Sequence, residues 1–73
     1  MRLQEFHDCV AHEFGAAHGA FIVSSHVLST LGGTPAELLD RGVTPREVWW
    51  ALCEDFQVPE DRRLGPDRGN DAH

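Results

Sequence analysis

The sequence predicts an all-α protein, a compact bundle of three to four short helices with a disordered C-terminal tail. Apolar residues recur at steps of three and four, and no stretch shows the period of two that marks a β-strand. Two Thr-Pro phrases give clear helix starts at Thr34 and Thr44. The 73 residues suffice for one domain. We place the helical domain at residues 1–58 and the flexible tail at 59–73.

The first helix is predicted over residues 3–14. Its apolar residues follow one another at steps of three or four and share one face with Cys9; they are Leu3, Phe6, Val10 and Phe14. Gly15 then supplies a stop, because glycine is favoured just after the end of a helix.

A second helix is predicted from about Ala17 to the Gly32-Gly33 pair, which is a strong C-terminal signal. Ser25 could instead cap a separate short helix that begins near His26, and the sequence leaves this alternative open. The buried stripe of the second segment is expected to consist of Ala17, Ala20, Phe21, Ser24, Leu28 and Leu31.

The next two helices begin with the same phrase. Thr34-Pro35-Ala36-Glu37 and Thr44-Pro45-Arg46-Glu47 each offer a threonine N-cap, a proline at the first helical position and a glutamate at the third. The first capping box opens a short helix that Gly42 closes. The second opens a helix that should end at about Phe56, because the residue before Pro59 avoids the helical region.

Trp49 and Trp50 are adjacent on the last predicted helix, so they point about 100° apart. Trp49 shares an apolar face with Leu52 and Phe56 and is assigned to the core. Trp50 projects away from that face. It either lies flat over a neighbouring helix or the tail, or it belongs to a contact surface, since tryptophan is enriched among binding anchors.

Ile22 is the second large apolar residue that is predicted to point outward, because it lies opposite the Phe21 stripe. Isolated apolar residues are common on protein surfaces, so neither Ile22 nor Trp50 requires a functional explanation. If they are functional, the candidate interaction surface consists of Trp50, Ile22, His18, His26 and Arg46.

The charge of the chain argues against nucleic acid as a partner. The formal net charge is −6, all the basic residues are arginines, and they form no cluster. Nucleic-acid-binding proteins usually carry a basic patch, because their affinity comes largely from neutralising phosphates. The region after Gln57 mixes both signs of charge with proline and glycine and is expected to be disordered, except that Val58 docks on the last helix.

The residue types that could support catalysis or metal binding lack the required spacing. Cys9, His12 and Cys53 form no paired ligand motif, whereas structural zinc needs four converging ligands. Cys53 is expected to face inward, where a thiol lacks the electropositive, accessible setting of a nucleophile. We therefore expect no enzymatic activity, no catalytic residues, no cofactor and no metal.

The N-terminal segment has no uninterrupted apolar run, so no signal peptide is expected. Residues 14–36 are free of Asp, Glu, Lys and Arg, but serines and histidines interrupt them and they match a membrane span poorly. The expectation is a cytoplasmic protein with reduced thiols and no membrane contact.

Three blocks of the sequence carry a family resemblance. They are F-x6-E-F-G at residues 6–15, S-H-V-L-S-x-L-G-G at 25–33 and G-V-x-P-x-E-V-W-x-A-L-C-E-D-F-x-V-P at 42–59. Over about residues 1–59 the chain resembles a family of short actinobacterial proteins catalogued as a domain of unknown function, number 3046. The resemblance implies a small helical cytoplasmic protein without an assigned activity or known catalytic residues. The family typically carries a basic residue where this chain has Trp50.

The sequence thus favours a non-enzymatic protein–protein interaction or accessory and regulatory factor. The expected partner is another protein, and the chain itself is expected to be a monomer or a weak homodimer. The alternative is a nucleic-acid-binding accessory protein in recombination or repair, because genes of the resembling family often lie near genes for those processes.

Overall fold

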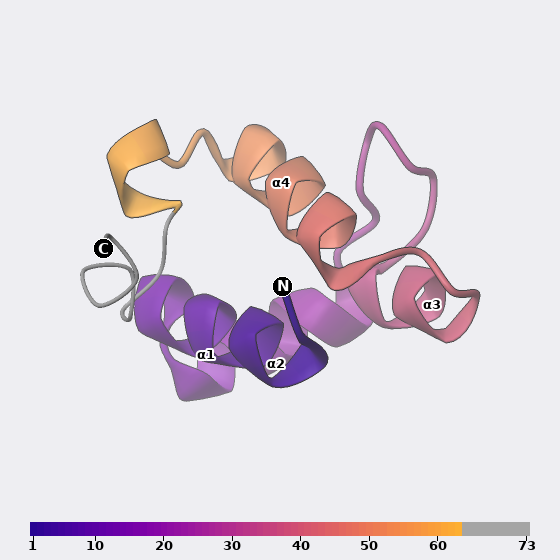
Figure 1. Ribbon diagram of the computed structural model, residues 1–73, viewed down its shortest axis with the longest axis horizontal. Helices are drawn as coiled ribbons and strands as arrows, with labels where there is room; N and C mark the ends of the chain where they lie inside the picture. The colour runs from indigo at the N-terminus through magenta and orange to yellow at the C-terminus, as the bar shows by residue number, and fades with distance from the viewer. Residues whose placement is uncertain (64–73) are drawn as a thin grey trace.

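The computed structural model describes residues 1–63, and within that range it confirms the all-α prediction. The helices are α1 (Leu3–Phe14), α2 (Ala16–Ser25), α3 (Pro35–Asp40) and α4 (Pro45–Phe56), followed by the short 3-10 turn η1 (Glu60–Arg62). The helices α1 and α2 lie beside each other, α4 crosses on the other side of the core, and α3 closes one end (Figure 1).

The two predicted threonine caps are present. The Thr34 hydroxyl accepts a hydrogen bond from the Glu37 backbone N–H at 3.2 Å, and the Glu37 carboxylate accepts one from the Thr34 N–H at 3.0 Å. At the start of α4, the Thr44 hydroxyl accepts from the Glu47 N–H at 3.2 Å. These bonds satisfy N–H groups that have no partner within their own helix, so they fix where α3 and α4 begin.

Gly15 alone connects α1 to α2. Its φ of 90° lies in the region that favours glycine, and its N–H donates to the Ala11 carbonyl at 2.9 Å. The chain reverses within this one residue, so α2 packs directly on α1. The two helices approach closely at Gly19, where a Cβ atom would come within 2.7 Å of Val10 Cγ1.

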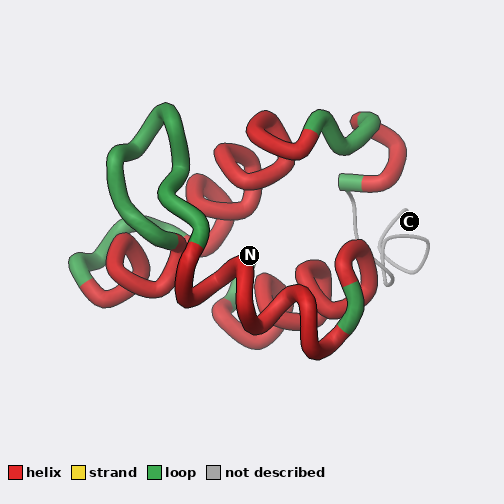
Figure 2. The backbone as a smooth tube through the Cα atoms, turned by 180° about the vertical axis from the view of Figure 1, so that it is seen from behind, coloured by secondary structure: helices red, strands yellow, loops and turns green. Residues whose placement is uncertain are grey.

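Helix α2 ends at Ser25, so both sequence-based expectations for the following segment were wrong. Residues 26–34 form a loop that rises beside α4 (Figure 2). Continuing α2 at 100° per residue would carry Leu28 to the same side as Phe21, away from the core. Leu28 is instead completely buried, and the loop is closed by a hydrogen bond from its N–H to the Gly33 carbonyl at 2.9 Å.

Trp49 lies at the centre of the core, as predicted, with only 1% of its surface exposed. The ring of Phe6 on α1 meets it edge to face, with the ring centroids 6.5 Å apart. The Trp49 indole Nε1–H donates to the Arg63 carbonyl at 2.7 Å. Val58 is also buried, which confirms that it docks just past α4.

Residues 59–63, which the sequence assigned to the tail, include η1 and cover one end of the bundle. Arg62 pairs with Glu13 at the end of α1 at 3.1 Å, and Arg63 pairs with Glu54 on α4 at 2.8 Å. The ordered structure therefore extends past residue 58. The rest of the predicted tail, residues 64–73, lies outside the described residues.

Candidate functional site

Ile22 is not on the surface, so its assignment to the candidate interaction surface was wrong. It is 2% exposed, whereas Phe21, which was placed in the core, is 64% exposed. The error is one of helical phase. Helix α2 faces α1 through Gly19 and turns Ile22 inward, and this orientation carries Phe21 to the opposite side.

Trp50 is half-buried and packs against the core cluster. The guanidinium of Arg63 lies over its ring, with the Arg63 Cζ atom 5.0 Å from the ring centroid. The Arg63 side chain is itself 9% exposed, and its Nε–H donates to the Val58 carbonyl at 2.7 Å. Contact with the segment after α4 therefore explains why Trp50 lies off the buried face of its helix. This matches the first of the two interpretations that the sequence left open, in which Trp50 packs against a neighbouring helix or the tail.

His26 has a structural partner as well. Its Nε2 atom lies 2.9 Å from an Asp55 carboxylate oxygen on α4. The same carboxylate accepts hydrogen bonds from the Ser29 N–H at 3.0 Å and from the Ser29 hydroxyl. Burial raises the pKa of Asp55, but the hydrogen bonds from Ser29 and His26 outweigh it and lower that pKa below its ordinary value. Asp55 thus fastens the loop to α4.

Replacing Asp55 with asparagine is expected to destabilise the protein by about 1–3 kcal/mol at neutral pH, because the loop donors lose a charged acceptor. A lowered folded-state pKa contributes stability above the ordinary value of 3.8, and this contribution is lost as the pH falls through the lower folded value. Urea denaturation of the wild type and Asp55→Asn from pH 7 toward acid measures the difference. The difference in free energy of unfolding between the two proteins should narrow below roughly pH 4. A difference that stays constant with pH would contradict the role assigned to the Asp55 carboxylate.

The remaining predicted surface residues, His18 and Arg46, are exposed on α2 and α4. Together with the buried Ile22, the covered Trp50 and the engaged His26, they do not make one continuous exposed surface. The structure therefore separates the five predicted residues instead of gathering them.

Among the side chains that could carry chemistry, the structure defines the surroundings of Cys53, Ser29 and His26. Burial raises the pKa of the Cys53 thiol to about 12, so it holds its proton at neutral pH. Ser29 and His26 both bond to the Asp55 carboxylate and not to each other in the contacts that the structure records. Residues 1–63 contain no group of three or more His, Cys, Asp or Glu side chains placed to hold a metal ion.

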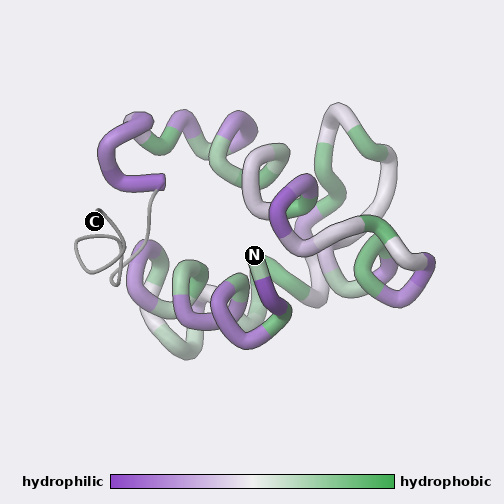
Figure 3. The backbone as a smooth tube through the Cα atoms, in the orientation of Figure 1, coloured by the Kyte–Doolittle hydropathy of each residue, from purple (hydrophilic) through white to green (hydrophobic). Residues whose placement is uncertain are grey.

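The outward side of α2 carries no Asp, Glu, Lys or Arg side chain. The exposed residues of α2 are Ala16, Ala17, His18, Ala20, Phe21, Ser24 and Ser25. We call four of them the α2 surface: Ala17, Ala20, Phe21 and Ser24. In Figure 3, α2 and the following loop are drawn largely in white and green, whereas purple marks the outer turns of α1 and residues 60–63. Val27, just beyond α2, is a further exposed apolar residue at 59%.

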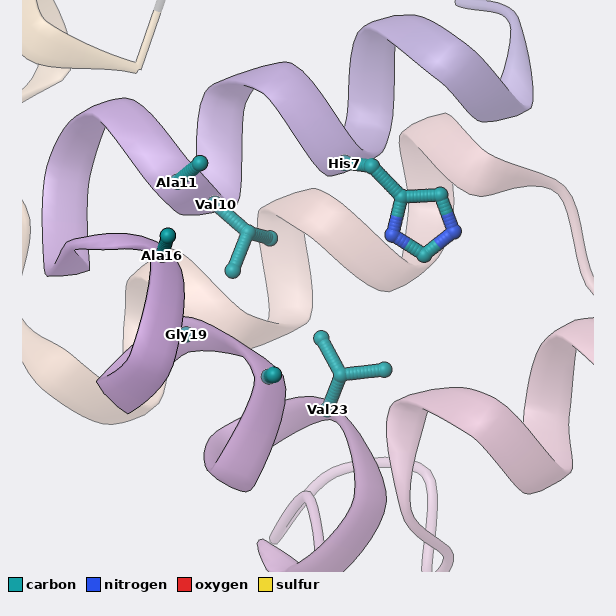
Figure 4. A pocket seen from close by; sticks show the side chains of 7 residues that line it. His7, Val10, Ala11, Ala16, Gly19 and Val23 are labelled. Atoms are coloured by element: carbon teal, nitrogen blue, oxygen red, sulfur yellow. The ribbon is translucent and has the colours of Figure 1, made fainter.

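A shallow groove runs along the α2 surface, between α1 and α2. It has a volume of about 300 Å³, and its lining is mainly apolar. Val10 and Val23 point into it from the two helices, with Ala16 toward one end and His7 at the other (Figure 4). Ala20 belongs to both the groove and the α2 surface, so the two features are continuous.

The sequence analysis missed the α2 surface because it read Phe21 as a core residue. One signal was available: α2 contains no Asp, Glu, Lys or Arg, so at least one exposed face had to be uncharged whatever its phase. Gly19 was the clue to that phase, because a glycine inside a helix often marks close packing.

Comparison with known proteins places residues 1–61 in the family described as a protein of unknown function, DUF3046, which is the family that the sequence resembles. A protein of Mycobacterium tuberculosis (strain ATCC 25618 / H37Rv), provisionally named an envelope-preserving system protein, is 54% identical over 35 residues. The match covers 47% of this chain and 13% of that protein, so this chain corresponds to a small part of its relative. No solved structure matches the chain. None of the described helices is long and apolar enough to cross a membrane.

Proposed function

The chain belongs to the DUF3046 family, and we propose that it is a non-enzymatic protein–protein interaction factor that binds its partner through the α2 surface. The observation that carries this proposal is Phe21, which is 64% exposed in the middle of a helix without a charged residue. Its exposed neighbours on α2 include Ala17, Ala20 and Ser24, and none is Asp, Glu, Lys or Arg, so the ring is part of a patch and is not isolated.

An uncharged outer helix face is unusual for a small protein in water. The solvent side of an amphipathic helix normally carries charged or polar residues, which keep the protein soluble. Helices α1 and α4 follow this pattern with exposed Asp8 and Glu47. The departure at α2 therefore favours a face that is covered when the protein is engaged, and aromatic residues are enriched at the centres of such contacts.

The chemistry of the described residues supports a role without catalysis. The Cys53 thiol is protonated at neutral pH, and the Asp55 carboxylate is used to hold the loop. An accessory or regulatory factor that acts in the cytoplasm by occupying a surface of another protein is consistent with these assignments. The alternative, nucleic-acid binding in recombination or repair, is opposed by the net charge of −6.

The proposal predicts that Phe21→Glu abolishes partner binding and leaves the fold intact. The substitution places a charge at the centre of the contact, where it would be desolvated without a counter-ion, so binding should fall at least about tenfold. The measurement is a quantitative pull-down from native lysate with tagged wild type and variant, and circular dichroism confirms that both are folded.

Arg46→Gln is the matched control, because it makes the net charge more negative by the same single unit on exposed α4. It should retain the wild-type partners. If the wild type and Phe21→Glu captured the same proteins in equal amounts, the assignment of the α2 surface would be overturned. If only Arg46→Gln lost the captured proteins, the contact would have to lie on α4.

A further inference from the structure

In the described structure, the segment without charged side chains offers two copies of this acidic chain a surface where they can meet without like-charge repulsion. The net charge is −6, and exposed acidic residues lie on α1 (Glu5, Asp8) and on α4 (Glu47, Glu54). A contact between copies through those helices would bring like charges together, which disfavours association. By contrast, residues 14–36 contain no Asp, Glu, Lys or Arg, and they include all of α2.

This region contains both a hollow and a projecting aromatic side chain. The groove beside α2 is lined mainly by small apolar side chains, and its volume of about 300 Å³ is at the lower end for sites that accept a ligand group. Phe21 stands next to Ala20 in sequence and is the most exposed large apolar side chain in the described structure. One copy therefore offers both an apolar hollow and an aromatic side chain of the kind that would fill it.

The positions of these two features around α2 permit a symmetric pairing. Ala16, Ala20 and Val23 lie on the flank of α2 that turns toward the groove, and Phe21 lies about 100° further round, toward the other flank. A two-fold axis parallel to α2 exchanges the two flanks between copies. It would bring Phe21 of each copy to the groove of the other, so the contact closes upon itself, as in an isologous dimer.

We propose that the partner of the α2 surface is a second copy of this chain, with Phe21 of each copy occupying the α1–α2 groove of the other. This inference rests on the proposed function, because it uses the same surface. A ten-residue helix spans about 15 Å, so the contact is smaller than a standard interface of roughly 800 Å² per partner. The dimer is consequently weak, with a dissociation constant on the order of 0.1 mM.

The first test is sedimentation equilibrium of the purified full-length chain between about 10 µM and 1 mM, a range that brackets the expected dissociation constant. The average mass should rise from the monomer value of 8.1 kDa toward twice that value. Phe21→Ala should weaken the association at least about tenfold, whereas Arg46→Gln should leave it within about twofold.

The second test identifies the groove. In a mixture of isotope-labelled and unlabelled chains, filtered NMR spectra should show contacts between the Phe21 ring of one copy and the Ala16 and Ala20 methyl groups of the other. A dimer without these contacts would overturn the groove assignment, and association that Phe21→Ala leaves unchanged would overturn it as well.

A wild type that stays monomeric up to about 1 mM, roughly ten times the expected dissociation constant, would overturn the self-association. If Phe21→Glu still lost its lysate partners in the pull-down, the proposed function would stand with a different protein as the partner. If those partners were also recovered equally by wild type and Phe21→Glu, the proposed function would fail too.

Discussion

Trp49→Ala is expected to reduce the free energy of unfolding by about 3–5 kcal/mol, the range for removing a large buried aromatic side chain. The indole is 1% exposed, packs edge to face on Phe6 and donates a hydrogen bond to the Arg63 carbonyl. Because the core of a chain of this length rarely supplies more than about 3–5 kcal/mol of stability, the variant should be largely unfolded at 25 °C.

Trp49→Phe separates the contribution of apolar packing from that of the hydrogen bond, since it retains most of the apolar volume and loses the hydrogen bond to the Arg63 carbonyl. It should cost less than the alanine variant. Trp50→Ala removes a half-buried ring and its contact with Arg63, and we expect a loss of about 1–2 kcal/mol. Urea denaturation followed by circular dichroism orders the variants, and an equal loss for Trp49→Ala and Trp50→Ala would contradict the assignment of Trp49 to the core.

Gly19→Val is expected to destabilise the protein by about 2–3 kcal/mol, because added atoms at this position overpack the contact between α1 and α2. A Cβ atom at Gly19 would lie 2.7 Å from Val10 Cγ1 and 3.2 Å from the Val10 carbonyl oxygen. A valine side chain is stiff and a backbone carbonyl does not move freely, so the helices themselves would have to separate.

Gly19→Ala is a more discriminating variant than Gly19→Val, because the sign of its effect on stability depends on whether α1 lies close to Gly19. In a solvent-exposed helix, replacing glycine with alanine gains about 1 kcal/mol, whereas here the same change should lose stability. Ala17→Val on the exposed face of α2 is the control and should change the free energy of unfolding by less than about 1 kcal/mol. A stabilised Gly19→Ala variant in urea denaturation would mean that α2 does not approach α1 at Gly19.

The helix starts and the phase of α4 were predictable because their causes are local. The two threonine caps satisfy neighbouring N–H groups, and the apolar residues of α4 are set against charged ones, so only one face can be buried. Helix α2 has no charged residue to mark its outer side. Its phase is instead decided by the close approach at Gly19, a contact with a different helix that periodicity does not register.

The end of α2 and the covering of Trp50 also depend on contacts between distant residues. Asp55 holds Ser29 across 26 positions of sequence, and Arg63 reaches over Trp50 from beyond the last helix. Neither contact leaves a repeating pattern in the sequence, so the loop was predicted as helix and Arg63 as tail. The candidate surface was wrong for the other reason, the phase of α2, because a rotation of that helix exchanges the positions of Phe21 and Ile22.

Site-specific photo-crosslinking tests the assignment of the α2 surface most directly. A photoreactive phenylalanine analogue replaces Phe21 in the full chain, and in a second version it replaces Arg46, which is exposed on α4. After irradiation in cells, the Phe21 position should give a discrete crosslinked product, either with another protein or with a second copy of the chain, and the Arg46 position should give much less. Crosslinks at Arg46 and none at Phe21 would contradict the account.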